Sequence, residues 1–477
     1  MYLSKRFADL PPEKKRRARL QLYLPILLLV SGLIVAALVL GRSDLLKPDQ
    51  TWTEVDFASL PEVQLLQEYV EVDTSPTTGS ELAGAEFLAD KLRSMGLEPH
   101  IEDLGHGRAN LWAVLEGESP EALVLHNHID VTPAEVSDDW LHPPFEAVIE
   151  KAWIYGRGTF DMKSIAVAQL LAIEDLVQEG KKPSRSVIFL ATGSEESGSH
   201  LGTKWILRQH PELADRFALV LTEGGVIEPV SVEEIKYWGI EFAQKWFAEG
   251  YLCGSSREQL EAIRSTLARL TNRNLDLRVT PEVQQFLASY GESRRKDEYR
   301  QFLEDTRKSL SHPSSFRKLP GYIKSLFREE LVTFPIEEDG SDGFKMRFFL
   351  HLFPDSNLEE VRRRLMPDWA IHGVSVVLGD PLGSAKGSPI DDPAFRVMSE
   401  AVIERYPEAR VGPHFLVWSA TDSRFFRQAG IPSYGFSPFP IFATDTFRHD
   451  AANERLGLPG YVTGIEIYRD VVRRLVD

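Results

Sequence analysis

The chain has 477 residues, 43% of them hydrophobic and 10% aromatic, which excludes a disordered protein and is long enough for two domains. Its formal net charge of −17 argues against nucleic-acid binding, because an acidic surface repels the phosphate backbone. Cys253 is the only cysteine, so an intramolecular disulfide is excluded.

The first fifty residues differ in charge from the rest, with nine lysines and arginines against four acidic residues. Leu20–Leu40 has no charged side chain and, as a helix, would span a hydrocarbon core of about 30 Å. The preceding basic residues place the N-terminus in the cytoplasm. We expect a single-pass anchor with the body periplasmic, extracellular or lumenal. A cleaved signal peptide or a buried helix is the alternative.

Apolar runs then alternate with helical patterns, which is typical of a parallel sheet flanked by helices. The runs 122–125, 187–192 and 218–222 predict buried central strands. The spacing of apolar residues over Lys163–Glu179 predicts a helix that ends at Gly180.

Polar residues follow each of these predicted strands. They are His128 and Asp130 after the first, Glu195 and Glu196 after the second, and Glu223 after the third. In open α/β sheets ligands bind beyond the carboxyl ends of the strands, so we expect these side chains to gather at one edge.

The middle of the chain has a different pattern of apolar and charged residues. Residues 236–252 and 343–354 read as strands of a smaller α+β unit, and about 270–330 is charged and helical. The fold class predicted is α/β, with a mostly parallel sheet interrupted by a smaller α+β lid domain. The predicted organisation is a basic cytoplasmic segment (1–19), the transmembrane anchor (20–41), a stalk (42–60), a catalytic domain in two parts (61–228 and 378–477) and the lid domain (229–377).

Taken singly, the polar residues are ordinary. Asp161 before the predicted helix could be an N-cap, and the adjacent glutamates could be a solvated pair. Taken together, two histidines and three carboxylates supply the ligands of a two-metal site in which one carboxylate bridges. Mixed nitrogen and oxygen ligation suits Zn²⁺, for which Co²⁺ or Mn²⁺ could substitute. The other glutamate of the pair could be a general base.

Four segments resemble the aminoacylase–carboxypeptidase S family of two-zinc hydrolases, in its N-fatty-acyl-amino acid hydrolase-like branch. They are HIDVTPAEVSDDWLHPPFEAVIEKAWIYGRGTFDMK, GSEESGSHLGTKWIL, LTEGGV and ATDSRFF. The order of the segments and the inserted lid both match the family. The resemblance covers residues 75–235 and 380–460.

The resemblance implies a role for each metal-site residue. Asp161 would be the bridging carboxylate, with His128 and Glu223 as ligands of one zinc. Glu196 and His449 would be ligands of the other zinc.

It also implies roles around the metals. Glu195 would be the general base, and Asp130 would be the carboxylate that orients His128 through its distal nitrogen. Arg424 would hold the carboxylate of the substrate with its guanidinium fork. The implied activity is cleavage of an amide bond next to a free carboxylate, in a small peptide or an N-acyl amino acid.

The chain departs from the family pattern in its lid. The family has a lid histidine, often supplied by a partner subunit, and the corresponding segment 250–256 has none. His351 lies near the place where the family has an arginine, and His449 and Glu454 are five residues apart instead of four. A dimer is therefore compatible with the sequence but not required. Two alternatives stay open, a metal-binding receptor or scaffold with little catalysis and a deacetylase or desuccinylase.

Overall fold

The computed structural model describes most of the chain after residue 54. The described residues are 55–134, 139–231, 233–273, 277–293, 303, 306–310, 316–317, 319–340, 343–365, 373–379, 386–441, 445 and 448–477. Within these ranges, no helix has both the length and the apolar character that crossing a bilayer needs. The predicted cytoplasmic segment, the anchor over 20–41 and the stalk up to residue 54 lie outside the described residues.

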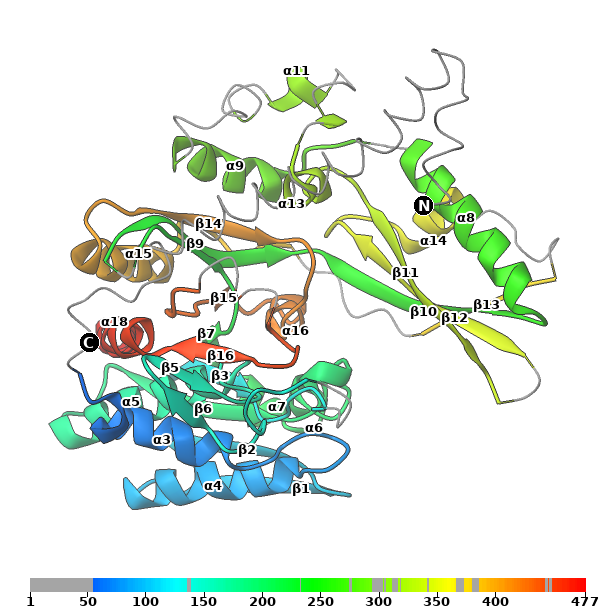
Figure 1. Cartoon of the computed structure of the whole chain (residues 1–477). Helices are drawn as coiled ribbons and strands as arrows, with labels where there is room; N and C mark the ends of the chain where they lie inside the picture. Colours follow the sequence, from blue (N-terminus) through cyan, green and yellow to red (C-terminus); the bar gives the residue numbers. More distant parts are fainter. Residues whose placement is uncertain are drawn as a thin grey trace, which may run out of the picture. The chain divides into compact units, whose positions relative to one another are not determined.

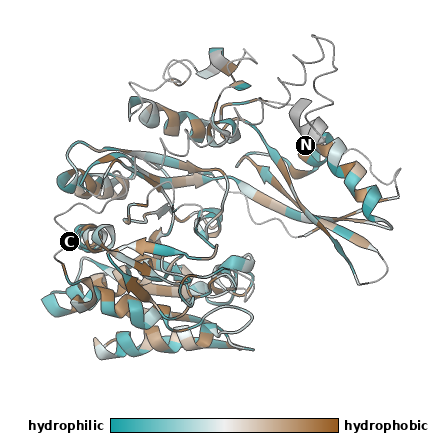
Figure 2. Ribbon diagram, viewed as in Figure 1, coloured by the Kyte–Doolittle hydropathy of each residue, from teal (hydrophilic) through white to brown (hydrophobic). Residues whose placement is uncertain are grey.

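A large sheet forms the centre of the fold (Figure 1). Among the described residues its order is β1 (His100–Gly105), β2 (Arg108–Leu115), β6 (Arg185–Thr192), β3 (Ser119–His128), β7 (Phe217–Thr222), β15 (Ser433–Gly435), β9 (Ile235–Gln244) and β14 (Arg410–Leu416), with β8 (Val226–Pro229) paired to β9. The apolar runs of β3, β6 and β7 are buried, as expected for central strands. Figure 2 shows apolar residues along this part of the sheet.

The sheet is mixed, so the prediction of a mostly parallel sheet is wrong outside its centre. Strand β3 is parallel to β6 and β7, β15 is parallel to β7, and β14 is parallel to β9. The pairs β1–β2, β2–β6, β9–β15 and β8–β9 are antiparallel. The connection between β1 and β2 is the tight turn at His106 and Gly107, which permits only antiparallel pairing.

Helices form before, between and after these strands. They are η3 (Phe57–Ser59), α3 (Pro61–Val70), α4 (Glu81–Ser94), α5 (Lys163–Glu179), α6 (Thr203–Gln209), α7 (Pro211–Ala214), α9 (Pro281–Ser293), α11 (Thr306–Leu310), α13 (Gly321–Ser325), α15 (Pro393–Arg405), α16 (Ser423–Gln428) and α18 (Leu458–Val476). Helix α5 has the bounds predicted from sequence, and Gly180 ends it in the left-handed conformation with φ 65°. It packs on β3, β6 and α18, so the sequence on both sides of the expected insertion shares one core.

A second sheet forms inside the segment expected to be the lid. Its order is β11 (Glu330–Glu338), β12 (Phe344–Leu352), β10 (Trp246–Gly254) and β13 (Ser375–Leu378), and the helices α8 (Arg257–Arg273) and α14 (Leu358–Leu365) pack against it. A small third sheet contains β16 (Arg455–Gly457), β5 (Trp153–Tyr155) and β4 (Val148–Glu150).

The change from one sheet to the other does not fall at the predicted domain limit of 229. Strand β9 lies inside the interval 229–377 but pairs with β14 and β15 of the large sheet. The chain reaches the second sheet only at Trp246, so the predicted strand 236–252 is two strands. The domain limits themselves stay a prediction.

Candidate metal centre and active site

The polar residues predicted from the sequence gather at one edge of the large sheet. His128 ends β3 and is in register with Thr192, which ends β6. Glu195 and Glu196 lie in the short 3-10 helix η4 (Glu195–Ser197) after β6, and Glu223 directly follows β7. Because β3, β6 and β7 are parallel, their carboxyl ends meet here.

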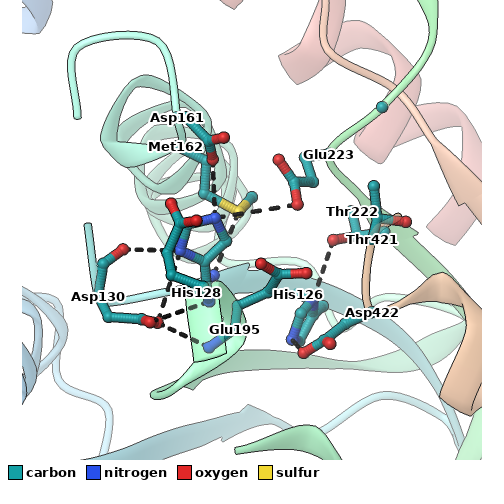
Figure 3. A network of polar contacts seen from close by, with 12 residues as sticks. His126, His128, Asp130, Asp161, Met162, Glu195, Thr222, Glu223, Thr421 and Asp422 are labelled. Atoms are coloured by element: carbon teal, nitrogen blue, oxygen red, sulfur yellow. Dashed lines mark hydrogen bonds and ion pairs between the residues drawn. The ribbon is translucent and has the colours of Figure 1, made fainter. Parts of the chain in front are cut away.

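Asp161 stands between two histidines. Its Oδ1 lies 2.8 Å from Nε2 of His128 (Figure 3), and its Oδ2 contacts Nε2 of His449. Helix α5 begins two residues later without a side-chain cap, so Asp161 is not the N-cap that its position alone suggested. One carboxylate therefore joins histidines from the two parts of the predicted catalytic domain.

Two groups of described residues hold metal-ligand atoms within 4.8 Å of one another. The first contains His128, Asp161 and Glu223, and the second contains Asp161, His449 and Asp450. Oε1 of Glu223 is 3.8 Å from Nε2 of His128, and Oδ2 of Asp450 is 3.2 Å from Nε2 of His449. Asp161 belongs to both groups, which is the geometry of a bridging ligand.

Asp450 is a candidate ligand that the sequence reasoning missed. The available signal was its place beside His449, but an Asp after a His is too common to single out. Asp450 has a positive φ of 56°, and Thr132 Oγ1 donates a hydrogen bond to its Oδ1 at 2.8 Å. Glu196 is in neither group, so its role as a ligand stays a prediction.

The cluster is crowded with buried negative charge. Burial raises the pKa of Glu223 and that of Glu196 well above the usual range, and the charge of Asp161 adds to both shifts. Burial also opposes ionisation of Asp161, but His449 and His128 hold its pKa well below the usual range. Carboxylates and imidazoles packed in this way are a donor set that divalent cations favour, so these residues fit two metal ions.

Asp130 connects the strand end to η4. Its two carboxylate oxygens accept hydrogen bonds from the backbone N–H groups of Glu195 and Glu196, at 3.0 and 3.1 Å. Nδ1 of His128 is 2.8 Å from the main-chain carbonyl of Asp130 and 3.7 Å from its carboxylate. The backbone carbonyl thus makes the nearer contact with the distal nitrogen of His128, and the role of the Asp130 carboxylate in orienting His128 stays a prediction.

A buried ion pair fixes the backbone on the other side of the cluster. Arg157 and Glu454 are each 1% exposed, with Nη1 of the arginine 2.8 Å from Oε2 of the glutamate. Glu454 Oε1 accepts hydrogen bonds from the backbone N–H groups of Phe160 and Asp161, and Arg157 donates to the carbonyl of Asp450. The pair therefore positions both Asp161 and the loop after His449.

Glu195 is a buried acid without a hydrogen bond on one oxygen. Its side chain is 10% exposed, and among the described residues no hydrogen-bond partner reaches Oε1, which lies 3.7 Å from Nη1 of Arg424. Burial raises the pKa of Glu195 to about 8; the charge of Asp422 adds to the shift and that of Arg424 opposes it. A carboxyl group that titrates near neutral pH is suited to proton transfer.

Arg424 is buried in the protein. It lies in α16, is 3% exposed, and stacks on the ring of Phe425 at 4.5 Å. Nη1 donates to the carbonyl of Thr421 at 2.9 Å, and Nη2 lies 3.7 Å from Oδ1 of Asp422. Phe425 and Phe426 are buried as well.

His126, a third histidine that the sequence did not single out, lies behind the cluster (Figure 3). His126 contacts the hydroxyls of Thr222 and Thr192 at 2.8 and 3.0 Å. Thr203 donates to Asp422 at 2.6 Å and also reaches His126. Burial lowers the pKa of His126 to about 4, so it is neutral and connects the ends of β3, β6 and β7 to α16.

A cavity of about 530 Å³ opens beside Glu195 and Arg424. The described residues that line it are Glu195, Glu196, Ser197, Gly198, His200, Phe247, Glu249, Arg347, Phe349, His351, Gly379, Trp418, Ala420 and Arg424. It thus joins the candidate proton-transfer group to residues of β10 and β12 in the second sheet.

The fold is α/β with a mixed central sheet, and a carboxylate shared by two histidines lies at the edge of that sheet. This combination is that of a metal-dependent hydrolase of the metallopeptidase and aminoacylase type. The model of peptidase family M20/M25/M40 matches residues 124–474, so the chain belongs to that family. The resemblance predicted from the sequence segments is confirmed.

Curated relatives include aminoacylase-1A of Rattus norvegicus, which is 25% identical over 87% of this chain and 95% of its own length. A succinyl-diaminopimelate desuccinylase of Alkalilimnicola ehrlichii is 34% identical over 31% of this chain and 38% of its own length. The chain is thus related to hydrolases with different substrates.

Solved structures show the same fold. An M20 family metallo-carboxypeptidase from Sulfolobus solfataricus superposes with a TM-score of 0.66 and 19% identity, covering 87% of this chain and 99% of that one. Human carnosine dipeptidase 1 gives a TM-score of 0.64 and 15% identity, covering 87% and 96%.

Proposed function

We propose that the chain is a two-zinc hydrolase that cleaves an amide bond next to a free carboxylate, in a dipeptide or an N-acyl amino acid. The observation that carries this proposal is Asp161, whose two oxygens each meet a histidine beside the buried acid Glu195. Membership of the M20 family and the similarity to aminoacylase-1A support it.

His128, Glu223 and Asp161 would hold one zinc, and Asp161 and His449 would hold the other with Asp450 or Glu196. When bound, two metals supply a water of lowered pKa and stabilise negative charge on the carbonyl oxygen under attack.

Glu195 would move the proton in this reaction. Its Oε1 has no hydrogen-bond partner among the described residues, and it lines the same cavity as Arg424. In this position it takes a proton from the attacking water and delivers it to the leaving nitrogen.

Arg424 would bind the substrate carboxylate. A guanidinium group presents two parallel N–H donors to a carboxylate, and its stacking on Phe425 fixes the plane of the group. The amide bond of a substrate held in this way lies toward Glu195, since Nη1 of Arg424 and Oε1 of Glu195 are 3.7 Å apart.

The test is metal removal followed by reconstitution. Chelated protein should lose amidase activity, and two equivalents of Zn²⁺ per chain should restore the release of a free amino acid from dipeptides or N-acyl amino acids. Stable binding of two zinc ions without amide hydrolysis would instead favour the receptor or scaffold alternative. Hydrolysis of amides that lack the neighbouring carboxylate would favour another hydrolase type.

Two further expectations from the sequence remain proposals. Leu20–Leu40 would anchor the protein with its body outside the cytoplasm, which predicts digestion by protease added to intact cells or spheroplasts. Protection of the whole chain would contradict this topology.

The segment 250–256 lacks the lid histidine that the family often takes from a partner subunit, so activity per chain should not depend on oligomeric state. A steep rise in activity across a dimer transition would contradict that.

A further inference from the structure

The two faces of the second sheet have different compositions. Side chains alternate along a strand, and Met346, Phe348, Leu350 and Leu352 of β12 point into the apolar core under α8 and α14. The residues between them, Arg347, Phe349 and His351, therefore lie on the other face.

Strand β10 follows the same alternation. Trp246, Ala248 and Leu252 belong to the core, so Phe247 and Glu249 lie on the other face. In register, Phe247 is opposite His351 and Glu249 is opposite Phe349. These residues line the cavity that holds Glu195 and Arg424. The face of the second sheet that turns away from its own core is therefore part of the candidate active site.

This cavity wall is aromatic and its charges are paired. The rings of Phe247 and His351 meet edge to face with centroids 4.5 Å apart, and Phe349 is 6.3 Å from Phe247. Arg347 Nε donates to Glu249 Oε1 at 2.6 Å, while the guanidinium lies over the Phe349 ring at 4.7 Å. The ion pair balances the wall's two charges, so it offers no net attraction to a charged substituent.

His351 is the third ring of this wall. The residue is 7% exposed, and its Nδ1 is buried with no hydrogen-bond partner among the described residues. Burial and the nearby charge of Lys245 lower its pKa to about 4, so the ring is neutral at physiological pH. The protein closes off this nitrogen, so what His351 contributes to the cavity is an uncharged aromatic ring.

We propose that Phe247, Phe349 and the uncharged ring of His351 form a specificity subsite that binds an aromatic or other apolar substituent of the substrate. The inference rests on the proposed amide hydrolysis and adds the substrate class. Ligand pockets commonly combine an apolar lining with a few placed polar groups, and this wall has that composition.

The test uses two substrate series on the full-length, zinc-loaded protein. One varies the acyl group on a fixed alanine (acetyl, hexanoyl, benzoyl, succinyl), and the other varies the amino acid under a fixed acetyl group (Gly, Leu, Phe, Asp, Lys). In at least one series kcat/KM should favour the apolar or aromatic member over the charged members by about tenfold or more.

Variants separate the subsite from the general stability of the sheet. Phe349→Ala should lower kcat/KM for the favoured aromatic substrate by about tenfold, and change that for acetylglycine by about twofold at most. His351→Phe keeps an aromatic ring at this position. It should therefore lower the preference for the aromatic substrate less than Phe349→Ala does. Val377→Ala is the matched control, because Val377 lies in β13 of the same sheet, is 53% exposed and does not line the cavity.

Binding distinguishes failure of the subsite from failure of the proposed function. Calorimetry on the Glu195→Gln protein should show tighter binding of the aromatic ligand than of acetylglycine, and Phe349→Ala should remove the difference. Equal losses for all substrates, or no preference in either series, would overturn the subsite while leaving amide hydrolysis intact. If no substrate is hydrolysed but the binding preference is present, the proposed function fails and the subsite stands.

Discussion

The candidate metal site differs from the cavity wall in how it is assembled. The metal site lies at one edge of the large sheet, and the cavity wall lies on the second sheet. The first collects His128, Asp161, Glu223 and His449 from four separate parts of the chain. The second is made by two neighbouring strands with ordinary alternation. Buried charges at the first depend on one another, so single changes there should have large effects. Apolar contacts at the second are more independent, so changes there should alter preference more than rate.

The largest effect is expected at Glu195. Glu195→Gln removes the proton-transfer group but keeps the volume, so turnover should fall by about 10²–10⁴-fold. Metal content, measured by elemental analysis, should stay unchanged, because the side chain belongs to neither metal group among the described residues. Full activity in this variant would remove Glu195 from the mechanism and leave the edge as a binding site.

Breaking the Arg157–Glu454 pair tests how far the cluster depends on its supports. Both side chains are 1% exposed, so Glu454→Gln leaves a buried arginine without its counter-charge. We expect a loss of about 3–5 kcal/mol in the free energy of unfolding, measured with urea. The matched control is Glu404→Gln, which breaks the surface pair with Arg474 and should change stability little. Similar losses in both variants would show that burial of the first pair does not matter.

Substrate recognition should respond more moderately. Arg424→Ala should weaken the binding of substrates with a free carboxylate by about ten- to a hundredfold, which corresponds to a charge-assisted hydrogen bond of about 1.5–3 kcal/mol. Arg424→Lys should restore only part of the loss, because it keeps the charge without the fork. Native protein should cleave amidated or esterified substrates poorly, and the Ala variant should treat acids and amides alike. A native enzyme that cleaves both equally would contradict the carboxylate rule.

A further effect, on the pH dependence of stability, is expected at a histidine outside the cavity. Burial lowers the pKa of His414 to about 3, and Tyr322 Oη lies 2.6 Å from its Nε2. An unfolded histidine titrates near 6.5, so the unfolded state binds more protons between about pH 6.5 and pH 3. The neutral ring makes its full contribution to the free energy of unfolding above about pH 6.5. That contribution falls by up to about 1.4 kcal/mol for each pH unit below this value.

His414→Gln should flatten this part of the stability profile. Urea unfolding of wild type and variant should differ by a constant amount above pH 7 and converge as the pH falls toward 4. Parallel profiles over the whole range would show that His414 takes up its proton equally in both states.

Much of the site could be predicted because its residues follow buried strands in a fixed order. The strand ends at 128, 192 and 222 and the helix 163–179 appear in the structure at or near their predicted limits. These elements are specified locally, by apolar runs and by Gly180 as a helix stop.

The errors have a different origin. The outer strands of the large sheet and the place of β9 in it both depend on pairing partners that are distant in sequence. Asp450 becomes a candidate ligand only because its loop folds back to Asp161.

The family, the buried strands and the residue types that could hold metal can all be inferred from the amino-acid sequence. Periodicity and side-chain chemistry are local properties, and they suffice for those conclusions. The folded chain is needed to show which carboxylates share one cluster, which atoms they offer, and that an aromatic face of the second sheet lines the same cavity as Arg424. Burial, pairing and pKa shifts arise from distances between residues far apart in the chain, and a sequence pattern does not contain those distances.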